Sequence, residues 1–269
     1  MLRVLRSIYF GLLNPKSFLK WIRGYSAFVN GQFWIKSIGS DSIFQSGTER
    51  VKIKESELKI FFDKKTKGRG IWKWEHYFDV YDRHLSKFVN KPIHLLEIGI
   101  YSGGSLEMWR SYFGNECNII GVDIEPACKS YANEFTKVII GDQESRSFWK
   151  DFRQTNPYLD IIIDDGGHQS NQQTVTFEES FRHLKPGGVF ICEDIHGLFN
   201  DFTFHSFCIA MNLNGMKKKK DNPAIISNSV QRQIASMHFY PFMVVIEKAP
   251  TLIDTLIAPR HGTEWQPFL

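Results

Sequence analysis

The sequence predicts an α/β fold in which a mostly parallel sheet carries helices on both faces. Short apolar segments rich in Ile and Val alternate with amphipathic segments between residues 93 and 194. Apolar strands separated in this way by helices are typical of a parallel sheet buried on both faces. Two apolar segments near residue 240 have almost nothing between them, which predicts a hairpin and one antiparallel strand in the sheet.

The periodicity of the apolar residues predicts each element in turn. A helix is expected over 74–89, and Pro92 ends it. Strands are expected at 93–98, 118–123, 137–141, 159–164 and 189–194, and the hairpin at 235–240 and 242–248. Helices are expected at 105–113 and 126–134, and around SFWKDF (147–152). A further helix should begin with a capping box from Ser170 to Gln173 and stop at KPGG (185–188).

The first 69 residues are predicted to be a small, basic, helical arm with a linker, and residues 70–269 to be the main domain. Helices are expected at 2–13 and from Pro15, with Asn14 as cap, to about Gly24. Residues 30–70 are expected to be irregular. Six basic residues and no acid precede Asp41, and the apolar run is too short to span a membrane. A membrane-surface helix, an organelle-targeting segment and an oligomerisation arm are the three interpretations.

The composition indicates a folded protein of a reducing compartment, which we expect to be the cytoplasm. Of its 269 residues, 42% are hydrophobic and 23% charged, which suffices for a core and excludes wholesale disorder. The four cysteines are scattered and form no CxxC pair, which argues against a disulfide framework. A net charge of +4 is too small to predict a nucleic-acid partner. The tetralysine at 217–220 is interpreted as a solvated loop.

A nucleoside cofactor is predicted where the first strand runs into EIGIYSGGS (97–105). Glycines at such a turn let the backbone approach a ligand closely, and Asp123 ends the next strand, where an acid binds ribose hydroxyls. The glycine pattern is not GxGxxG, and Glu97 before the loop is unfavourable for a pyrophosphate. These features favour a ligand with a positively charged group over a dinucleotide.

Acids also end the fourth and fifth predicted strands, and a histidine follows the first pair. Asp164 and Asp165 end one strand, Glu193 and Asp194 end the other, and His168 follows two glycines. Neighbouring strands lie about 4.8 Å apart, so these carboxylates would repel one another unless a cation lies among them or some turn away. Oxygen ligands favour a hard ion: Mg²⁺, or else Mn²⁺ or Ca²⁺. Strand-end capping explains part of the acid cluster but not His168.

In this order and spacing, the motifs resemble those of the class I S-adenosylmethionine-dependent methyltransferases. EIGIYSGGS, GVDIEP, GDQES, LDIIIDD, LKPGG and the closing hairpin carry the resemblance over about residues 70–248. It implies a Rossmann-like sheet of seven strands with the last antiparallel, and S-adenosylmethionine as cofactor. The cofactor residues that follow are Glu97, Gly99, Tyr101, Ser102, Gly103, Ser105, Asp123, Asp142, Gln143 and Asp164.

The spacing DDGxH with an ED pair 25 residues later resembles the metal-dependent sugar O-methyltransferases that modify macrolide antibiotics, and cephalosporin hydroxylase-like relatives. The resemblance implies Asp165, Glu193 and Asp194 as metal ligands and His168 as general base. The cation would lower the pKa of a hydroxyl, and an imidazole suits the removal of its proton. The stretch WKWEHYFDVY (72–81) would help to close the pocket, with candidates Trp72, Lys73, His76 and Tyr77.

The predicted function is therefore methyl transfer from S-adenosylmethionine to a hydroxyl of a sugar or glycosylated small molecule. The alternatives are a catechol-like phenol O-methyltransferase, a non-catalytic S-adenosylmethionine-binding scaffold and, disfavoured by the glycine pattern, a dinucleotide-dependent reductase. The expected partner is a small hydroxylated acceptor and not a nucleic acid. Peripheral membrane contact through the arm and a homo-oligomer are further expectations.

Overall fold

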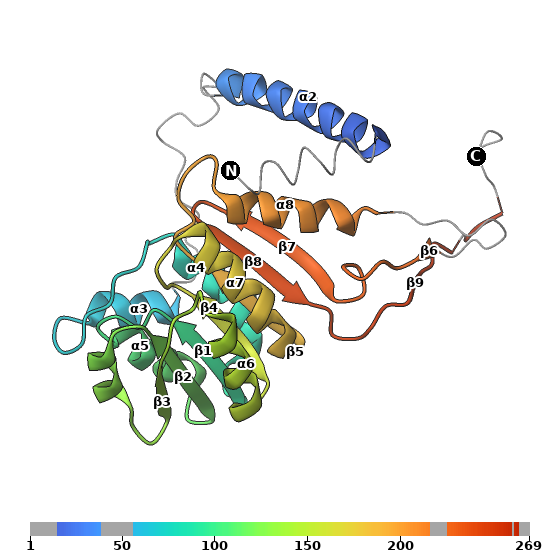
Figure 1. Cartoon of the computed structure of the whole chain (residues 1–269). Helices are drawn as coiled ribbons and strands as arrows, with labels where there is room; N and C mark the ends of the chain where they lie inside the picture. The colour runs from blue at the N-terminus through green and yellow to red at the C-terminus, as the bar shows by residue number, and fades with distance from the viewer. Residues whose placement is uncertain (1–14, 39–55, 216–224, 260, 264–269) are drawn as a thin grey trace. The chain divides into compact units, whose positions relative to one another are not determined.

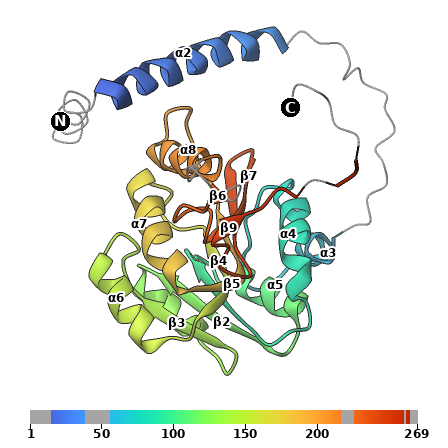
Figure 2. The same ribbon diagram turned by 90° about the vertical axis from the view of Figure 1, so that its right-hand side faces the viewer.

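A computed structural model describes residues 15–38, 56–215, 225–259 and 261–263 (Figures 1 and 2). The chain divides into two compact units, Met1–Lys54 and Glu55–Leu269. The first contributes one described helix, α2 (Pro15–Ile38), which continues well beyond the expected end at Gly24. The helix expected at 2–13 and the tetralysine at 217–220 lie outside the described residues. No described helix is both long and apolar enough to cross a membrane.

The second unit is built on a seven-stranded sheet with the order β3-β2-β1-β4-β5-β8-β7. β1 to β5 are parallel to one another, and β8 pairs antiparallel with both β5 and β7, so the predicted antiparallel closing strand is confirmed. The strands are β1 (Ile93–Ile98), β2 (Cys117–Asp123), β3 (Thr136–Ile140), β4 (Leu159–Asp164), β5 (Leu184–Cys192), β7 (Ile234–Tyr240) and β8 (Met243–Lys248).

Alternating strand residues divide the core into two apolar layers, one on each face of the sheet. In β4, Ile161 and Ile163 join one layer while Ile162 joins the other. The first layer packs against α3 (Glu57–Lys64), α4 (Tyr77–Leu85) and α5 (Gly104–Phe113), and the second against α6 (Arg146–Thr155), α7 (Ser170–Ser180) and α8 (Asp201–Leu213) (Figure 2). Helices therefore cover both faces, as predicted.

Several elements differ from the prediction. The capping box of α7 is made by Gln169 and Gln172, one residue earlier than expected. KPGG (185–188) does not stop that helix: α7 ends at Ser180, a short 3₁₀ turn follows at Phe181–His183, and KPGG lies in β5. Residues 126–131 form a 3₁₀ helix rather than an α-helix. The helix expected at 74–89 is α4 followed by a 3₁₀ turn at Ser86–Phe88. A two-stranded sheet of β6 (Ile225–Ile226) and β9 (Thr255–Leu256) was not predicted.

The expected irregular linker at 30–70 contains α3, which belongs to the core of the second unit. Leu58 of α3 is fully buried, and Phe62 lies 5.0 Å from Phe78 of α4 between ring centroids. The expectation of irregular structure is therefore wrong for residues 30–38, which continue α2, and for residues 57–64, where an apolar face anchors α3 to α4 and α5. We propose that the boundary between arm and domain lies at residues 54 and 55 rather than at 69 and 70.

Leu58→Ala should destabilise the protein by about 2–5 kcal/mol, because it removes a fully buried side chain and leaves a cavity. Lys67→Ala, at an exposed position in the following coil, should change stability by less than about 0.5 kcal/mol. Urea unfolding of both variants measures the difference. Equal stability of the two variants would mean that α3 is not part of the core.

Candidate active site

A cavity of about 730 Å³ opens at the carboxyl ends of β1, β2, β3, β4 and β5. In parallel sheets this end is where ligands bind, and the volume is typical of a small-molecule site. The segment 70–74 and Tyr77 of α4 supply its remaining wall together with His196 after β5. The predicted cofactor loop and the predicted acids thus border one cavity.

Close packing of the backbone at the ends of β1 and β4 explains the first glycine of the loop. Gly99 has φ +80°, and a Cβ there would lie 2.0 Å from the carbonyl oxygen of Asp165. The strand register causes this contact, since Ile98 pairs with Asp164 and the next residues meet. Gly99 therefore lets the loop after β1 pass over the loop that carries Asp165 and His168.

Asp123 lies at the end of β2, as predicted, and backbone groups hold its carboxylate. The backbone N–H of Tyr101 donates to Oδ2 at 3.0 Å, and the N–H of Glu125 donates to Oδ1 at 2.9 Å. Asp142, at the end of β3, is fixed in the same way by the N–H of Glu144 at 2.8 Å. Both acids border the cavity with their orientation fixed in advance of any ligand.

The structure brings most of the predicted cofactor residues together at the cavity and places three of them behind it. The residues that line it are Gly99, Tyr101, Ser102, Ser105, Asp123, Asp142 and Gln143. Glu97 is fully buried instead, and its carboxylate accepts from Ser105 at 2.8 Å and from Trp109 at 3.1 Å. Gly103 packs against Tyr131 with φ +75°, and Asp164 is 1% exposed.

Asp164 supports the loop that carries His168. Gln143 Nε2 donates to its Oδ1 at 3.0 Å, while Gln143 Oε1 accepts from the N–H of Gly167 at 2.8 Å. A Cβ on Gly166 would lie 1.9 Å from the same amide oxygen, so a larger residue there would displace the Gln143 amide from these contacts. Burial raises the pKa of Asp164 to about 7, against the opposing hydrogen bond from Gln143. Its Oδ2 has no hydrogen-bond partner among the described residues.

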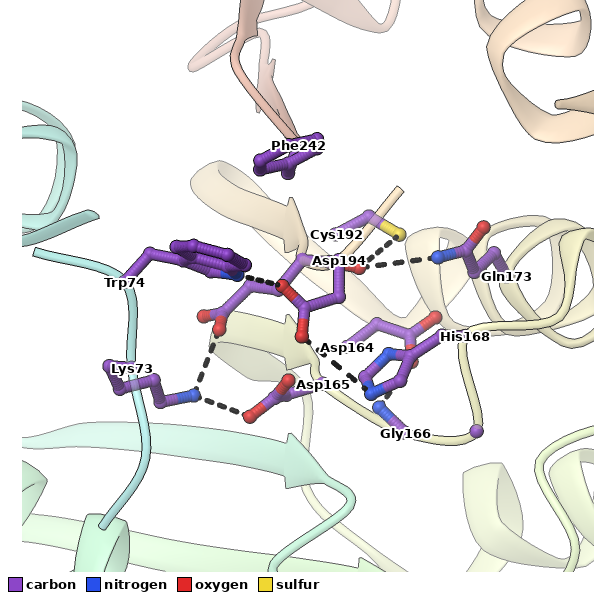
Figure 3. Close-up of polar contacts among 12 residues, drawn as sticks. Lys73, Trp74, Asp164, Asp165, Gly166, His168, Gln173, Cys192, Asp194 and Phe242 are labelled. Atoms are coloured by element: carbon purple, nitrogen blue, oxygen red, sulfur yellow. Dashed lines mark hydrogen bonds and ion pairs between the residues drawn. The ribbon is translucent and has the colours of Figure 1, made fainter. Parts of the chain in front are cut away.

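Asp165, His168 and Asp194 each present one ligand atom within 4.8 Å of the other two. Trp74 Nε1 and Tyr77 OH both donate to Oδ1 of Asp194, at 2.9 and 2.8 Å. Its Oδ2 is left facing His168 Nε2 at 3.8 Å (Figure 3). His168 and Asp194 have φ values of +58° and +53°, in the left-handed region that costs energy for residues other than glycine. Such strain is typical of functional positions.

Lys73 places an ammonium group inside the acid cluster. Its Nζ lies 2.6 Å from Asp165 (Figure 3). The same atom lies 2.9 Å from Glu193, and the lysine side chain is 2% exposed. Burial alone would lower the pKa of Lys73, but the charges of Asp165 and Glu193, with that of Glu97 at 3.8 Å, raise it well above its ordinary value. Lys73 is therefore charged and forms a buried salt bridge with the acids. The sequence predicted only that Lys73 would help to close the pocket.

Both carboxylate oxygens of Glu193 are engaged by protein groups. Tyr81 OH donates to Oε1 at 2.6 Å and Lys73 to Oε2 at 2.9 Å, and the side chain is fully buried. Burial raises the pKa of Glu193 despite the neighbouring ammonium. Glu193 is also absent from the three-residue ligand group formed by Asp165, His168 and Asp194. Its predicted role as a metal ligand stays a prediction, in which the ion would use a lone pair that Tyr81 and Lys73 leave free or would displace one of these donors.

The charge balance of the cluster fits a divalent cation. Lys73 is its only described lysine or arginine partner, against the carboxyl groups of Glu97, Asp164, Asp165, Glu193 and Asp194. One oxygen of Asp194 is free of donors on the side that faces His168, and Nδ1 of His168 is buried without a partner among the described residues. Oxygen donors with one imidazole nearby suit Mg²⁺ or Mn²⁺.

Sequence reasoning missed the contacts made by Trp74, Tyr81 and His196. Trp74 and His196 line the cavity, and Tyr81 lies beneath it on Glu193. Tyr77 and Tyr81 are four residues apart, so the helical periodicity places both hydroxyls on one face of α4. From this spacing the sequence could have predicted that both hydroxyls reach the acids after β5.

Comparison with known proteins supports a methyltransferase assignment. Residues 96–195 match the family described as "Methyltransferase domain". Demethylmacrocin O-methyltransferase of Streptomyces fradiae is 35% identical over 226 residues, covering 71% of this chain and 56% of that protein. Mycinamicin VI 2''-O-methyltransferase of Micromonospora griseorubida is 30% identical over 195 residues, covering 64% and 48%. This chain thus spans about half the length of these curated relatives.

A solved structure shares the fold. It is described as the MycE methyltransferase from the mycinamycin biosynthetic pathway in complex with Mg and SAH. It superposes with a TM-score of 0.59 at 25% sequence identity, over 72% of this chain and 53% of that one. The predicted resemblance and the Rossmann-like sheet are confirmed by these matches.

Lys73→Met should cost about 3–5 kcal/mol in stability, because it leaves Asp165 and Glu193 without their buried counter-charge. The double variant Lys73→Met/Glu193→Gln should recover part of that loss. Arg232→Met, which breaks an exposed pair with Asp254, should cost no more than about 1 kcal/mol. Chemical denaturation of the parent protein and the three variants measures these differences. A Lys73→Met protein as stable as the parent would show that the salt bridge contributes nothing.

Proposed function

From the methyltransferase domain that this chain carries over residues 96–195, we propose that it is a metal-dependent O-methyltransferase acting on a hydroxyl of a sugar or glycosylated small molecule. The observation that carries the proposal is the convergence of Asp165, His168 and Asp194 on one wall of the cavity. The same cavity is bordered by Asp123 and the loop after β1. The cavity thus has a cofactor end, at Asp123 and the loop after β1, and an acid–base end, at Asp165, His168 and Asp194.

The cofactor end is proposed to hold S-adenosylmethionine, which supplies an electrophilic methyl group when bound. Asp123 would accept hydrogen bonds from ribose hydroxyls, since an acid at the end of the second strand does this in related folds. Asp142 and Gln143 would border the base. Gly99 and Ser102, which line the cavity beside the acids, would contact the part of the ligand that carries the methyl group.

Asp165 and Asp194 are proposed to hold a divalent cation, with Glu193 as the third ligand of the predicted set. When bound, the cation lowers the pKa of a hydroxyl that it contacts. Trp74 and Tyr77 hold Asp194 in position through its Oδ1, so Oδ2 is the oxygen available for this role. Lys73 fixes Asp165 and neutralises part of the remaining negative charge.

His168 is proposed to accept the proton that the acceptor hydroxyl loses. Its Nε2 lies 3.8 Å from Asp194 Oδ2 and therefore faces the same space as the carboxylates. The imidazolium formed there would be stabilised by that carboxylate. Removal of this proton would accompany formation of the new oxygen–carbon bond as the methyl–sulfur bond breaks and S-adenosylhomocysteine leaves, and positioning of the two reactants would supply much of the remaining rate.

The acceptor is proposed to be a sugar. The curated relatives bear names of enzymes that methylate glycosylated natural products, and one structure is described as a complex with Mg, SAH and mycinamycin VI. In this chain, Trp72 lines the cavity and is 90% exposed, so its ring is available to stack on a sugar face.

We further propose a cytoplasmic location, with the arm at 1–54 serving membrane contact or oligomerisation.

Asp123→Ala should weaken binding of S-adenosylhomocysteine by about 1.5–3 kcal/mol, because a charge-assisted hydrogen-bond acceptor is lost. The two carboxylate oxygens also accept from the N–H groups of Tyr101 and Glu125, one each, so Asp123→Asn, with a single acceptor oxygen, removes the charge but can keep only one of these contacts. Isothermal titration calorimetry measures both variants. Tighter binding of NADH than of S-adenosylhomocysteine by the parent protein would contradict the cofactor assignment.

His168→Ala should lower the turnover of labelled S-adenosylmethionine by roughly 10²–10⁴ while leaving cofactor affinity nearly unchanged, as expected for loss of a general base. A panel of glycosides and catechols serves as acceptors. EDTA should abolish turnover in the parent protein, and Mg²⁺ should restore it.

The same assay separates the two roles open to His168. Recovery of His168→Ala activity in excess Mg²⁺ would make this residue a metal ligand rather than a base. Full activity of the parent protein in EDTA would remove the cation from the mechanism and return the acids to strand-end capping. Methylation of the catechols alone would replace the sugar acceptor by a phenol.

A further inference from the structure

A second group of metal-ligating side chains lies apart from the cavity, on the outer part of the sheet. His84 comes from α4, His238 from β7 and Glu247 from β8, and each offers a ligand atom within 4.8 Å of the other two. None of the three lines the cavity. We propose that these three residues bind one transition-metal ion, zinc in the first place, at a site distinct from the active site.

The spacing of the donor atoms suits such an ion. In a tetrahedral zinc site with bonds of about 2.0–2.1 Å, neighbouring ligand atoms lie about 3.3 Å apart. His84 Nδ1 and Glu247 Oε1 are 2.7 Å apart, and the ring centroids of His84 and His238 are 4.5 Å apart. An ion would widen the His84–Glu247 pair, while all three donor atoms already lie within 4.8 Å of one another.

The other ring nitrogen of each histidine is already engaged by a hydroxyl oxygen. His84 Nε2 lies 2.9 Å from Tyr240 OH, and His238 Nε2 lies 3.0 Å from Ser236 Oγ. Metal-binding histidines typically donate their second N–H to an oxygen in this way, which fixes the tautomer and the ring orientation. Both histidines can therefore present Nδ1 to one ion, so the cluster is more organised than a chance ion pair.

The donor set separates this site from the active site in metal preference. Two imidazoles and one carboxylate favour zinc and its transition-metal neighbours over magnesium. Two cations oppose binding: Lys87 lies 3.6 Å from Glu247, and Arg83 lies 3.4 Å from Tyr240 OH.

A metal at this site would fix α4 to the hairpin of β7 and β8. The same helix carries Tyr77 and Tyr81, whose hydroxyls hold Asp194 and Glu193. The ion would therefore stabilise the wall that positions the active-site acids without touching the reactants. This proposal does not depend on the identity of the reaction.

Titration with Co²⁺ tests the site in the tag-free full chain after chelator treatment, with excess Mg²⁺ present to occupy the active site. We expect one equivalent of Co²⁺ with visible d–d absorption, displaced by Zn²⁺. His238→Gln and Glu247→Gln should each weaken Co²⁺ binding by more than about ten-fold. They are preferred to substitutions of His84, which is 3% exposed and whose loss could prevent folding.

Two control variants make the result specific. His205→Gln breaks another histidine–carboxylate pair, 3.3 Å from Glu178, and should bind Co²⁺ like the parent protein. The double variant His168→Ala/Asp194→Asn should still bind one equivalent of Co²⁺, because its altered residues belong to the active site. Zn²⁺ should raise the thermal unfolding midpoint of the parent protein but not that of His238→Gln. Equal Co²⁺ affinity in the parent and in His238→Gln, or no Co²⁺ binding by the parent, would overturn the proposal.

Discussion

The buried ammonium of Lys73 is the contact on which the arrangement of the active site depends. It joins Asp165 after β4 to Glu193 after β5, and both acids would repel each other at this distance without it. Their position follows from the register of β4 and β5, which pairs Asp164 with Cys192. A single lysine still leaves the cluster negative, and that excess is the physical reason why we propose a divalent cation beside it.

The coil before α4 and α4 itself together hold the acids of the active site. Lys73 and Trp74 reach the acids from this coil, while Tyr77 and Tyr81 reach them from the helix itself. Each acid after β5 therefore has its orientation set by groups from one segment of the chain. Because that helix also packs on β7 and β8, its position couples the hairpin to the active site. A metal at His84 would act through this coupling.

The sheet and the loop residues were predictable from the sequence because their signals are local. Apolar runs such as IIID mark strands, and strand ends in a parallel sheet meet at one edge, which brings Asp165 and Asp194 together.

The salt bridge of Lys73 was not predictable, since a coil residue reaches this position only through tertiary packing. The helix α3 was missed for a similar reason: its short apolar face is defined by α4 and α5. The capping box was misplaced by one residue because overlapping polar residues at 169–173 offered two registers.

Diffraction from crystals grown with Mn²⁺ and S-adenosylhomocysteine tests the central claim most directly, because the anomalous signal locates the ion. We predict a peak between Asp165 and Asp194, within reach of Asp194 Oδ2, with Glu193 as the third ligand of the ion. A peak that Glu193 does not reach, with its contacts to Lys73 and Tyr81 both kept, would remove Glu193 from the ligand set. Absence of a peak at these acids, with cofactor bound in the cavity, would contradict the claim that the cluster holds a divalent cation.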